Sequence, residues 1–240
     1  MEKVVWLSFL AGMATLAGAL LVLVSEGLVR VQKALAGLLG FAAGVMIGVV
    51  TLDLLPVAMA YGNVTQVVAG IATGILVMYM LDLLAAGPWA ESRQYGSLAV
   101  LGYLVAGSIA LHDLPEGLAI GVGYVAQRSL GWTIALAVAI HNIPEGMAIA
   151  APLRAEKVDA WTVLLLVSSI ALVTPLGAII GWLMADLTRQ LIGLLMALAA
   201  GAMIYVIRFE LVPSSRNLNS GFASWGLFWG IVAALLLERG

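Results

Sequence analysis

Long apolar stretches separated by short polar connections dominate this chain. A helix that crosses a bilayer needs roughly 20 apolar residues, and eight stretches reach that length. They cover about residues 4–24, 34–60, 64–85, 97–126, 130–153, 160–185, 190–212 and 220–237. Their apolar character is continuous rather than alternating, which favours helices over the strands of a membrane barrel. The pattern predicts an all-α integral membrane protein with eight transmembrane helices.

The polar connections are too short to hold a second domain. They include Pro88–Gly96, Gln127–Ser129 and Arg154–Asp159, so residues 1–240 are predicted to form a single transmembrane domain. The first apolar stretch is longer than the core of a usual signal peptide, and no small-residue cleavage site follows it. We therefore expect it to be the first membrane helix.

Composition indicates the same class of protein. The chain is 63% hydrophobic and 10% charged, with a mean hydropathy of +1.10, and these values exclude a water-soluble domain of this size. The formal net charge is −2 and the sequence has no basic patch, which excludes nucleic acid as a partner. Cysteine is absent, so disulfides and thiolate ligands are excluded too.

Lysine and arginine are distributed unevenly between the two sides of the predicted membrane domain. One side holds Arg30, Lys33, Arg93, Arg154, Lys157, Arg208 and Arg216, and the other holds Lys3, Arg128, Arg189 and Arg239. Cytoplasmic loops are enriched in these two residue types. Both termini are therefore predicted to lie on the extracytoplasmic side of a cell membrane.

A nine-residue phrase occurs twice, each time midway along an apolar stretch. It reads HDLPEGLAI at residues 112–120 and HNIPEGMAI at residues 141–149, and it contains both histidines of the chain. The histidine and the glutamate of each copy are four residues apart, so on a helix they share one face. Two such faces brought together would offer two imidazoles and two carboxylates at one depth in the membrane.

Ionisable side chains are costly at mid-bilayer, roughly 2.5 to 3.5 kcal/mol each on insertion scales. A bound cation offsets that cost, and imidazole with carboxylate suits zinc, cadmium, iron, manganese or cobalt. The predicted metal ligands are His112, Glu116, His141 and Glu145, with Asp113 and Asn142 about 100° away around their helices. The alternative is a hydrogen-bonded cluster that only holds the helices together.

Prolines lie beside these predicted ligands. Pro115 and Pro144 each remove one helix hydrogen bond, so we expect the helices to be locally broken there, with carbonyl groups freed toward a cavity. Pro175 frees the carbonyl of Ala171 in the same way, next to Thr174.

A second internal repeat relates two other stretches. Residues 42–47 (AAGVMI) precede Asp53, and residues 199–204 (AAGAMI) precede Glu210 at the same spacing. Both repeats fit one inverted arrangement, with helices 1–3 related to 6–8 and helix 4 to helix 5. Asp53 and Glu210 would then lie near opposite faces of the membrane, as groups on a transport path. Asp82 is a further candidate, and a solvated helix end is the alternative for all three.

The motifs resemble those of the ZIP (Zrt/Irt-like) family of divalent metal transporters, in particular its prokaryotic members. The resemblance rests on HDLPEG and HNIPEG, on AAGVMI with DLLP, on TPLG at residues 174–177, and on AAGAMI with ELVP. It implies uptake of zinc or a related divalent ion into the cytoplasm. It also implies a two-metal site between helices 4, 5 and 6, a homodimer, and an elevator-like motion of helices 1, 4, 5 and 6.

The sequence departs from the family pattern at several positions. Thr174 stands where many members have a glutamate shared by two metals, Val57 and Ser214 replace glutamates after the other two prolines, and the loop at 88–96 has no histidine. Asp113, Glu116 and Glu145 together supply three negative charges, which two divalent ions would exceed. We therefore expect one strong metal position, and a weak or absent second position beside Thr174.

The predicted function is transport of a divalent metal, most simply Zn²⁺, with no enzymatic activity and no cofactor other than the transported ion. No phosphate-binding loop is present, so ATP hydrolysis is not expected. The alternatives are an intramembrane metalloenzyme such as a hydrolase, and a metal sensor. A hydrolase would need a general base and an open coordination position. Channel and carrier modes of transport both remain open, and metal loading should weaken as protons compete for the ligands.

Overall fold

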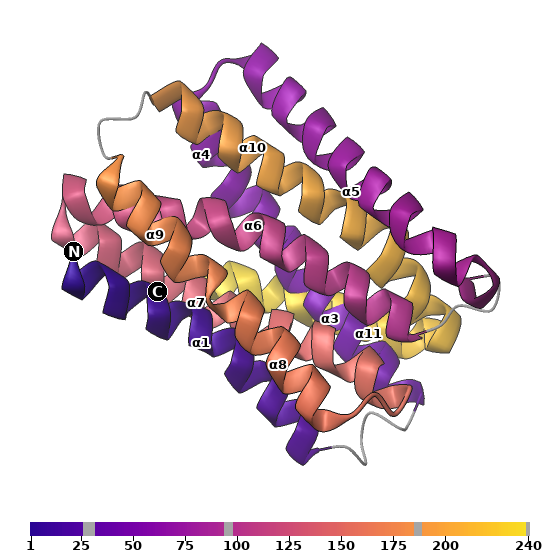
Figure 1. The fold of residues 1–240 in the computed structure, drawn as a ribbon. Helices are drawn as coiled ribbons and strands as arrows, with labels where there is room; N and C mark the ends of the chain where they lie inside the picture. Colours follow the sequence, from indigo (N-terminus) through magenta and orange to yellow (C-terminus); the bar gives the residue numbers. More distant parts are fainter. Residues whose placement is uncertain (26–31, 94–97, 185–188, 239–240) are drawn as a thin grey trace.

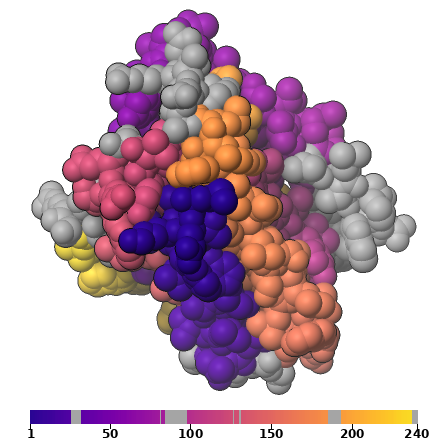
Figure 2. Space-filling model, turned by 60° about the vertical axis from the view of Figure 1, so that its left-hand side comes forward, coloured from indigo at the N-terminus to yellow at the C-terminus, as the bar shows by residue number. Residues whose placement is uncertain are grey.

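The computed structural model of the chain describes residues 1–25, 32–93, 98–184 and 189–238, and its regular structure in these ranges is entirely helical (Figure 1). The elements in chain order are α1 (Glu2–Val24), α3 (Gln32–Gly48), η1 (Val49–Leu54), α4 (Leu55–Tyr61), α5 (Val64–Arg93), α6 (Leu98–Ala126), α7 (Arg128–Ala155), α8 (Ala160–Ala171), α9 (Val173–Leu183), α10 (Arg189–Tyr205), η2 (Val206–Leu211) and α11 (Val212–Glu238). In Figure 2, α1 lies at the surface beside the orange α8 and α9.

Six of the described helical segments are long and apolar enough to cross a membrane, and Val64–Met80 is a shorter apolar helix. The prediction of an all-helical, multi-pass membrane protein is confirmed at this level. The last segment, Gly193–Leu236, would measure about 66 Å if it were straight, twice the roughly 30 Å of a bilayer core. Its backbone leaves helical geometry at Asn219, where φ is −166° and ψ is 109°. Beyond that residue the chain packs along α3. The count of eight crossings stays a prediction.

One predicted connection is shorter than expected. α5 continues through Pro88 to Arg93, because a single missing hydrogen bond does not end a helix whose neighbouring turns are intact. Residues 94–97 of that predicted connection lie outside the described residues. The same holds for Arg30 and Arg239, which enter the predicted charge asymmetry.

Glycines bring the helices together in side-by-side pairs: α1 with α7, α6 with α9, α5 with α10, and α3 with α11. Residue numbers rise together along each contact, as where Gly70 faces Ala197 and Gly74 faces Leu198, so the paired helices run parallel. A Cβ atom added to any of the following glycines would lie 2.1–2.6 Å from an atom of the partner helix: Gly40, Gly44, Gly48, Gly70, Gly74, Gly177, Gly181, Gly226 and Gly230. Glycine at these positions therefore allows the close approach of the helices.

Two of these contacts repeat each other. Gly18 of α1 lies against the carbonyl of Ile143 in α7, and Gly177 of α9 lies against the carbonyl of Leu114 in α6. Ile143 and Leu114 occupy the same position in the two copies of the nine-residue motif. Each copy is thus held by a different helix through the same kind of glycine contact.

The second repeat has a structural counterpart as well. Two six-residue π-helical turns, η1 and η2, occupy matching positions in it, and they carry Asp53 and Glu210. Each turn is followed within two residues by a proline, Pro56 or Pro213. A proline ring clashes with the carbonyl four residues earlier, and the wider π turn relieves that clash. Such turns frequently mark functional positions in helices.

Candidate metal centre

The two copies of the motif form the polar centre of the bundle. His112 and Glu116 lie on α6, and His141 and Glu145 lie on α7, in each case one helical turn apart. All four side chains are buried. The core around them is apolar, with many Leu, Ile, Val, Ala and Met side chains. Burying four ionisable groups in such surroundings is costly unless each has a partner.

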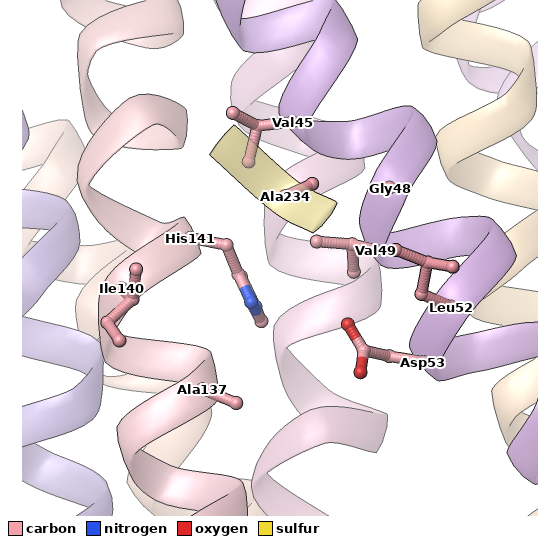
Figure 3. Close-up of a pocket in the computed structure, with 9 residues that line it drawn as sticks. All are labelled: Val45, Gly48, Val49, Leu52, Asp53, Ala137, Ile140, His141 and Ala234. Carbon is pink, nitrogen blue, oxygen red and sulfur yellow. The ribbon is translucent and has the colours of Figure 1, made fainter. Parts of the chain in front are cut away.

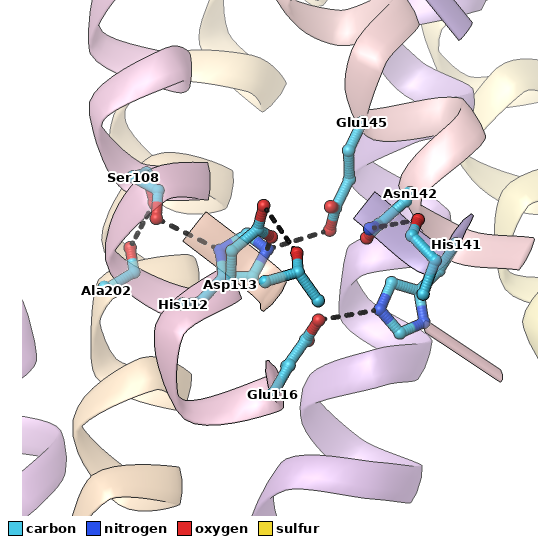
Figure 4. A network of polar contacts seen from close by, with 10 residues as sticks. Ser108, His112, Asp113, Glu116, His141, Asn142, Glu145 and Ala202 are labelled. Carbon is cyan, nitrogen blue, oxygen red and sulfur yellow. Dashed lines mark hydrogen bonds and ion pairs between the residues drawn. The ribbon is translucent and has the colours of Figure 1, made fainter. Parts of the chain in front are cut away.

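The partners come from the opposite helix. Nε2 of His112 lies 3.1 Å from Oε1 of Glu145, and Nε2 of His141 lies 3.1 Å from Oε2 of Glu116 (Figure 4). Each imidazole therefore faces the carboxylate of the other copy rather than its own. The structure brings together the four side chains that the sequence predicted to converge.

The orientation of His112 is fixed from behind. Its Nδ1 lies 3.1 Å from the carbonyl oxygen of Ser108, one turn earlier on α6. A carbonyl can only accept a hydrogen bond, so Nδ1 carries the proton and donates it. Nε2 is then the atom that faces the carboxylates, and a metal ion bound there would take the place of the proton shared with Glu145. This is the arrangement in which histidines usually bind metals.

Distances around Nε2 of His112 are close to those between the ligands of a small divalent ion. With bonds of about 2.0–2.2 Å, tetrahedral ligand atoms lie about 3.3–3.6 Å apart. Nε2 is 3.1 Å from Oε1 of Glu145 and 3.6 Å from Oδ1 of Asp113. Ligand atoms of His112, Asp113 and Glu116 all lie within 4.8 Å of one another. An ion could enter this cluster without large movements of the helices.

Several acceptor atoms in the centre have no hydrogen-bond partner. They are Oδ1 of Asp113, Oε1 of Glu116, Oδ1 of Asn142 and Oε2 of Glu145, and all are inaccessible to solvent. A buried oxygen without a donor costs free energy. Four such oxygens around two imidazoles are therefore a strong indication that a cation or water completes the centre.

The residues that follow the two histidines face different helices. Asp113 points toward α9, where the hydroxyl of Thr174 donates a hydrogen bond of 3.4 Å to its Oδ2. Asn142 points toward α1, and its amide donates a hydrogen bond of 3.1 Å to the carbonyl of Ala11. Since Nδ2 of Asn142 is used in this way, its Oδ1 is left as a free acceptor. Thr174, predicted to lie beside the second metal position, does contact a predicted ligand.

The prolines have a weaker local effect than expected. α6 continues through Pro115 and α7 continues through Pro144, so the predicted local breaks are absent from these two helices as the structure describes them. The reason is the tight packing of the following turn, since Gly117 and Gly146 are clamped against backbone atoms of α9 and α1. The interruption predicted near Pro175 is present, because α8 ends at Ala171 and α9 begins at Val173.

A cavity reaches His141 from the side of η1. It has a volume of about 60 Å³, enough for a few water molecules, and it is lined by Val45, Gly48, Val49, Leu52, Asp53, Ala137, Ile140, His141 and Ala234. The imidazole of His141 and the carboxylate of Asp53 point into it from opposite walls (Figure 3). Asp53, predicted as a path residue, therefore shares a cavity with a predicted ligand.

The other two predicted path residues lie in different surroundings. Asp82 of α5 is buried and accepts a hydrogen bond of 2.7 Å from the hydroxyl of Tyr205 at the end of α10. This bond ties α5 to α10, and the burial of Asp82 differs from the solvated helix end that the sequence left open as the alternative. Glu210 lies in η2, at the position that matches Asp53 in η1.

Sequence reasoning missed two contributors to the centre. Ser108 supplies the carbonyl that orients His112, and its hydroxyl donates a hydrogen bond of 3.5 Å to the carbonyl of Ala202 in α10. Ala11 supplies a carbonyl to Asn142. Ser108 had a signal, since it is the polar residue one turn before His112. Ala11 had none, because any residue type provides a backbone carbonyl.

Comparison with known proteins places this geometry in a family. Residues 88–238 match the model of the ZIP zinc transporter family. Zinc transporter GufA of Myxococcus xanthus is 38% identical over 135 residues, which cover 55% of this chain and 52% of that protein. Zinc transporter ZIPB of Bordetella bronchiseptica is 41% identical over 133 residues, covering 55% and 43%. Zinc transporter ZIP11 of Bos taurus is 35% identical over 174 residues, covering 65% and 50%.

The chain spans about half the length of the curated relatives that it matches. The family model, by contrast, covers well over half of this chain and includes both copies of the nine-residue motif. The resemblance inferred from the motifs is therefore confirmed, and the chain belongs to the ZIP family of zinc transporters.

Proposed function

We propose that this protein carries zinc across a membrane into the cytoplasm through the centre formed by α6 and α7. The observation that carries this proposal is the crossed pairing of His112 with Glu145 and of His141 with Glu116, buried in the core of the bundle. The relatives described above are named as zinc transporters, which favours transport over the alternative of a metal-dependent hydrolase.

Nitrogen and oxygen donors without sulfur suit zinc, and they also accept cadmium, iron, manganese or cobalt. Zinc is proposed as the preferred ion because the relatives described above are named as zinc transporters. The other ions are proposed as weaker substrates. Competition between them and zinc in the uptake assay below would rank them.

We further propose a single strong metal position at His112, Glu116, His141 and Glu145, with Asp113 and Asn142 at its edge. The three negative charges of the carboxylates are enough to balance one divalent ion. Two divalent ions would leave an excess of positive charge. Thr174 occupies the adjoining place and brings a hydroxyl instead of a charge. Metal titration of the purified protein should give one ion per chain, whereas two equally tight ions would contradict this.

Eight crossings with an inverted repeat are the proposed topology, with both termini extracytoplasmic. Three observations support it: the departure from helical geometry at Asn219, the matching π turns η1 and η2, and the equivalent glycine contacts of Gly18 and Gly177. Asp53 and Glu210 then lie toward opposite faces, where one attracts the ion and the other receives it. Labelling of single cysteines introduced at Lys157 and Gln127 from each side of the cell membrane would test the orientation.

The family resemblance also implies a homodimer, which we include in the proposal. Crosslinking in native membranes would test it.

Zinc uptake into proteoliposomes tests the proposed function directly. Glu145→Gln removes one charged ligand while keeping the shape of the side chain, and we expect uptake to fall by roughly 100-fold, the upper end of the range for loss of an outer hydrogen-bond partner. The matched control is Glu156→Gln, on the exposed residue that follows α7, which should transport like the wild type. Equal uptake by wild type and Glu145→Gln would overturn the proposal.

The hydrolase alternative makes a different prediction in the same preparation. A zinc hydrolase would cleave ester or amide substrates in detergent, where no gradient exists, and would do so without moving zinc. Hydrolysis that disappears in Glu145→Gln, together with unchanged zinc flux, would favour that alternative.

A further inference from the structure

A second cavity opens on the outer surface of the bundle, away from the metal centre. It has a volume of about 470 Å³ and is lined by Glu2, Lys3, Trp6, Leu7, Leu10, Tyr124, Arg128 and Trp132. These residues come from the first turns of α1, the last turn of α6 and the first turns of α7. In Figure 2 the indigo start of α1 lies at the surface beside pink residues of the α6–α7 region.

The cavity has a charged end. Lys3 and Arg128 both line it, and Glu2 is the one acidic residue in its lining. Within the described part of the chain, neither Lys3 nor Arg128 forms an ion pair or a side-chain hydrogen bond. The two cations and Glu2 together give the lining of the cavity a net charge of +1. Because neither cation is paired within that part of the chain, this wall favours the binding of an anionic group.

The other end of the cavity is apolar and faces outward. Trp6, Leu10 and Trp132 are 60%, 61% and 59% exposed. Large apolar side chains exposed on a membrane protein face lipid. Leu10 lies seven residues beyond Lys3 on the same helix, about 10 Å deeper along its axis. The wall thus changes from cationic to apolar over the distance that separates a phospholipid headgroup from the upper part of its acyl chains.

Aromatic residues indicate the depth at which this cavity lies in the membrane. Trp6, Trp132 and Tyr124 all line it, and tryptophan and tyrosine concentrate at the boundary between headgroups and hydrocarbon. The close approach of α7 to α6 helps to form the wall, because a Cβ atom on Gly131 would lie 2.6 Å from Cβ of Tyr124. The close contact between the end of α6 and the start of α7 therefore holds together Tyr124, Arg128 and Trp132.

We propose that this cavity binds one anionic phospholipid, with its phosphate between Lys3 and Arg128 and its acyl chains along Trp6, Leu10 and Trp132. Each lysine or arginine close to a membrane surface attracts anionic headgroups. The bound lipid bridges the start of α1 and the start of α7, two helices that also meet at the hydrogen bond from Asn142 to Ala11. The lipid thereby strengthens the α1–α7 pair that supports the second copy of the motif.

The test measures binding of dioleoyl phosphatidylglycerol to the full chain purified in a mild detergent, by native mass spectrometry and by the shift in thermal unfolding. Removing both cations with Lys3→Gln and Arg128→Gln should weaken binding roughly 30-fold. The matched control is Lys157→Gln with Arg216→Gln, which removes two exposed cations elsewhere on the molecule and should leave binding unchanged. Phosphatidylcholine should bind the wild type more weakly than phosphatidylglycerol.

Further measurements distinguish the binding of a lipid from the binding of a simple anion. Inorganic phosphate at the same concentration should give no thermal shift, because it leaves the apolar wall exposed. The variant Trp132→Gln keeps both cations, and it should lose phosphatidylglycerol binding even if the charge variant fails to fold. Wild-type affinity in either cavity variant, equal binding of phosphatidylcholine, or equal protection by phosphate would overturn the proposal. None of these results depends on zinc transport.

Discussion

The two copies of the nine-residue motif have nearly the same sequence but different neighbours. In α6, Nδ1 of His112 donates to the carbonyl of Ser108, and its Nε2 faces two acidic residues. In α7, the hydrogen bond described for His141 is to Glu116 alone, and its ring lines the cavity that also contains Asp53. The first histidine is held from both sides, whereas the second lies at an opening.

The residues after the histidines show the same contrast. Asp113 faces a side chain, the hydroxyl of Thr174 on α9, whereas Asn142 is bound to a backbone carbonyl on α1. Sequence symmetry therefore supplies equivalent candidate ligands, and the neighbouring helices give them different surroundings. We infer that His112 holds the ion in place and that His141 is the ligand through which the ion exchanges with the cavity.

The largest difference between the two copies is expected in zinc affinity when each histidine is removed separately. His112→Gln is expected to weaken zinc binding by at least about 100-fold, since a ligand fixed by its neighbours is lost. His141→Gln is expected to weaken it by roughly tenfold, because water from the cavity can take the vacant position. Zinc titration of the purified variants would measure both, and equal losses would break the distinction between the two copies.

A charge placed beside the first copy should change the number of bound ions. Thr174→Glu adds a fourth carboxylate next to Asp113, so the charge of two divalent ions is balanced. We expect the zinc content to rise from one to two ions per chain, as measured by elemental analysis after removal of free metal. Thr174→Gln is the uncharged control and should keep one ion. A wild-type stoichiometry of two would show that the hydroxyl already suffices.

The glycine contact behind the second copy offers a test through stability. A Cβ atom at Gly146 would lie 1.8 Å from the carbonyl oxygen of Thr15, so Gly146→Ala must push α1 away. We expect a loss of about 1–3 kcal/mol in the free energy of unfolding. Thermal unfolding in detergent would measure this loss. Gly107→Ala is the control on α6, since nothing lies within 4 Å of the added atom, and its effect should stay within about 0.5 kcal/mol. Equal stability of the two variants would show that the contact with α1 does not support the second copy of the motif.

The smallest expected effect concerns the hydroxyl behind the first copy. Ser108→Ala removes a long hydrogen bond of 3.5 Å to Ala202 but keeps the backbone carbonyl that orients His112. Zinc affinity should therefore change by less than about threefold, in the range of a weak neutral hydrogen bond. A larger loss in the same zinc titration would mean that the hydroxyl, rather than the carbonyl, fixes the imidazole.

Much of the fold and of the centre could be predicted because the signals are local. The apolar stretches gave the helices, and the four-residue spacing of histidine and glutamate gave their common face. The matching position of Asp53 and Glu210 in the second repeat appears in the structure as two π turns. The breaks expected at Pro115 and Pro144 were wrong, since a local rule for proline does not include the packing that keeps the next turn in place.

The amino-acid sequence by itself determined that this is a helical membrane protein of the ZIP family and which side chains are candidate metal ligands. It did so because helix periodicity and the cost of charge in a bilayer act over a few residues. Only the tertiary structure decided that each histidine faces the glutamate of the other helix, that α9 and α1 flank different copies, and that a cavity reaches His141. Those outcomes depend on which helices pack together, and the close contacts of glycines such as Gly117 and Gly146 with distant segments set that packing.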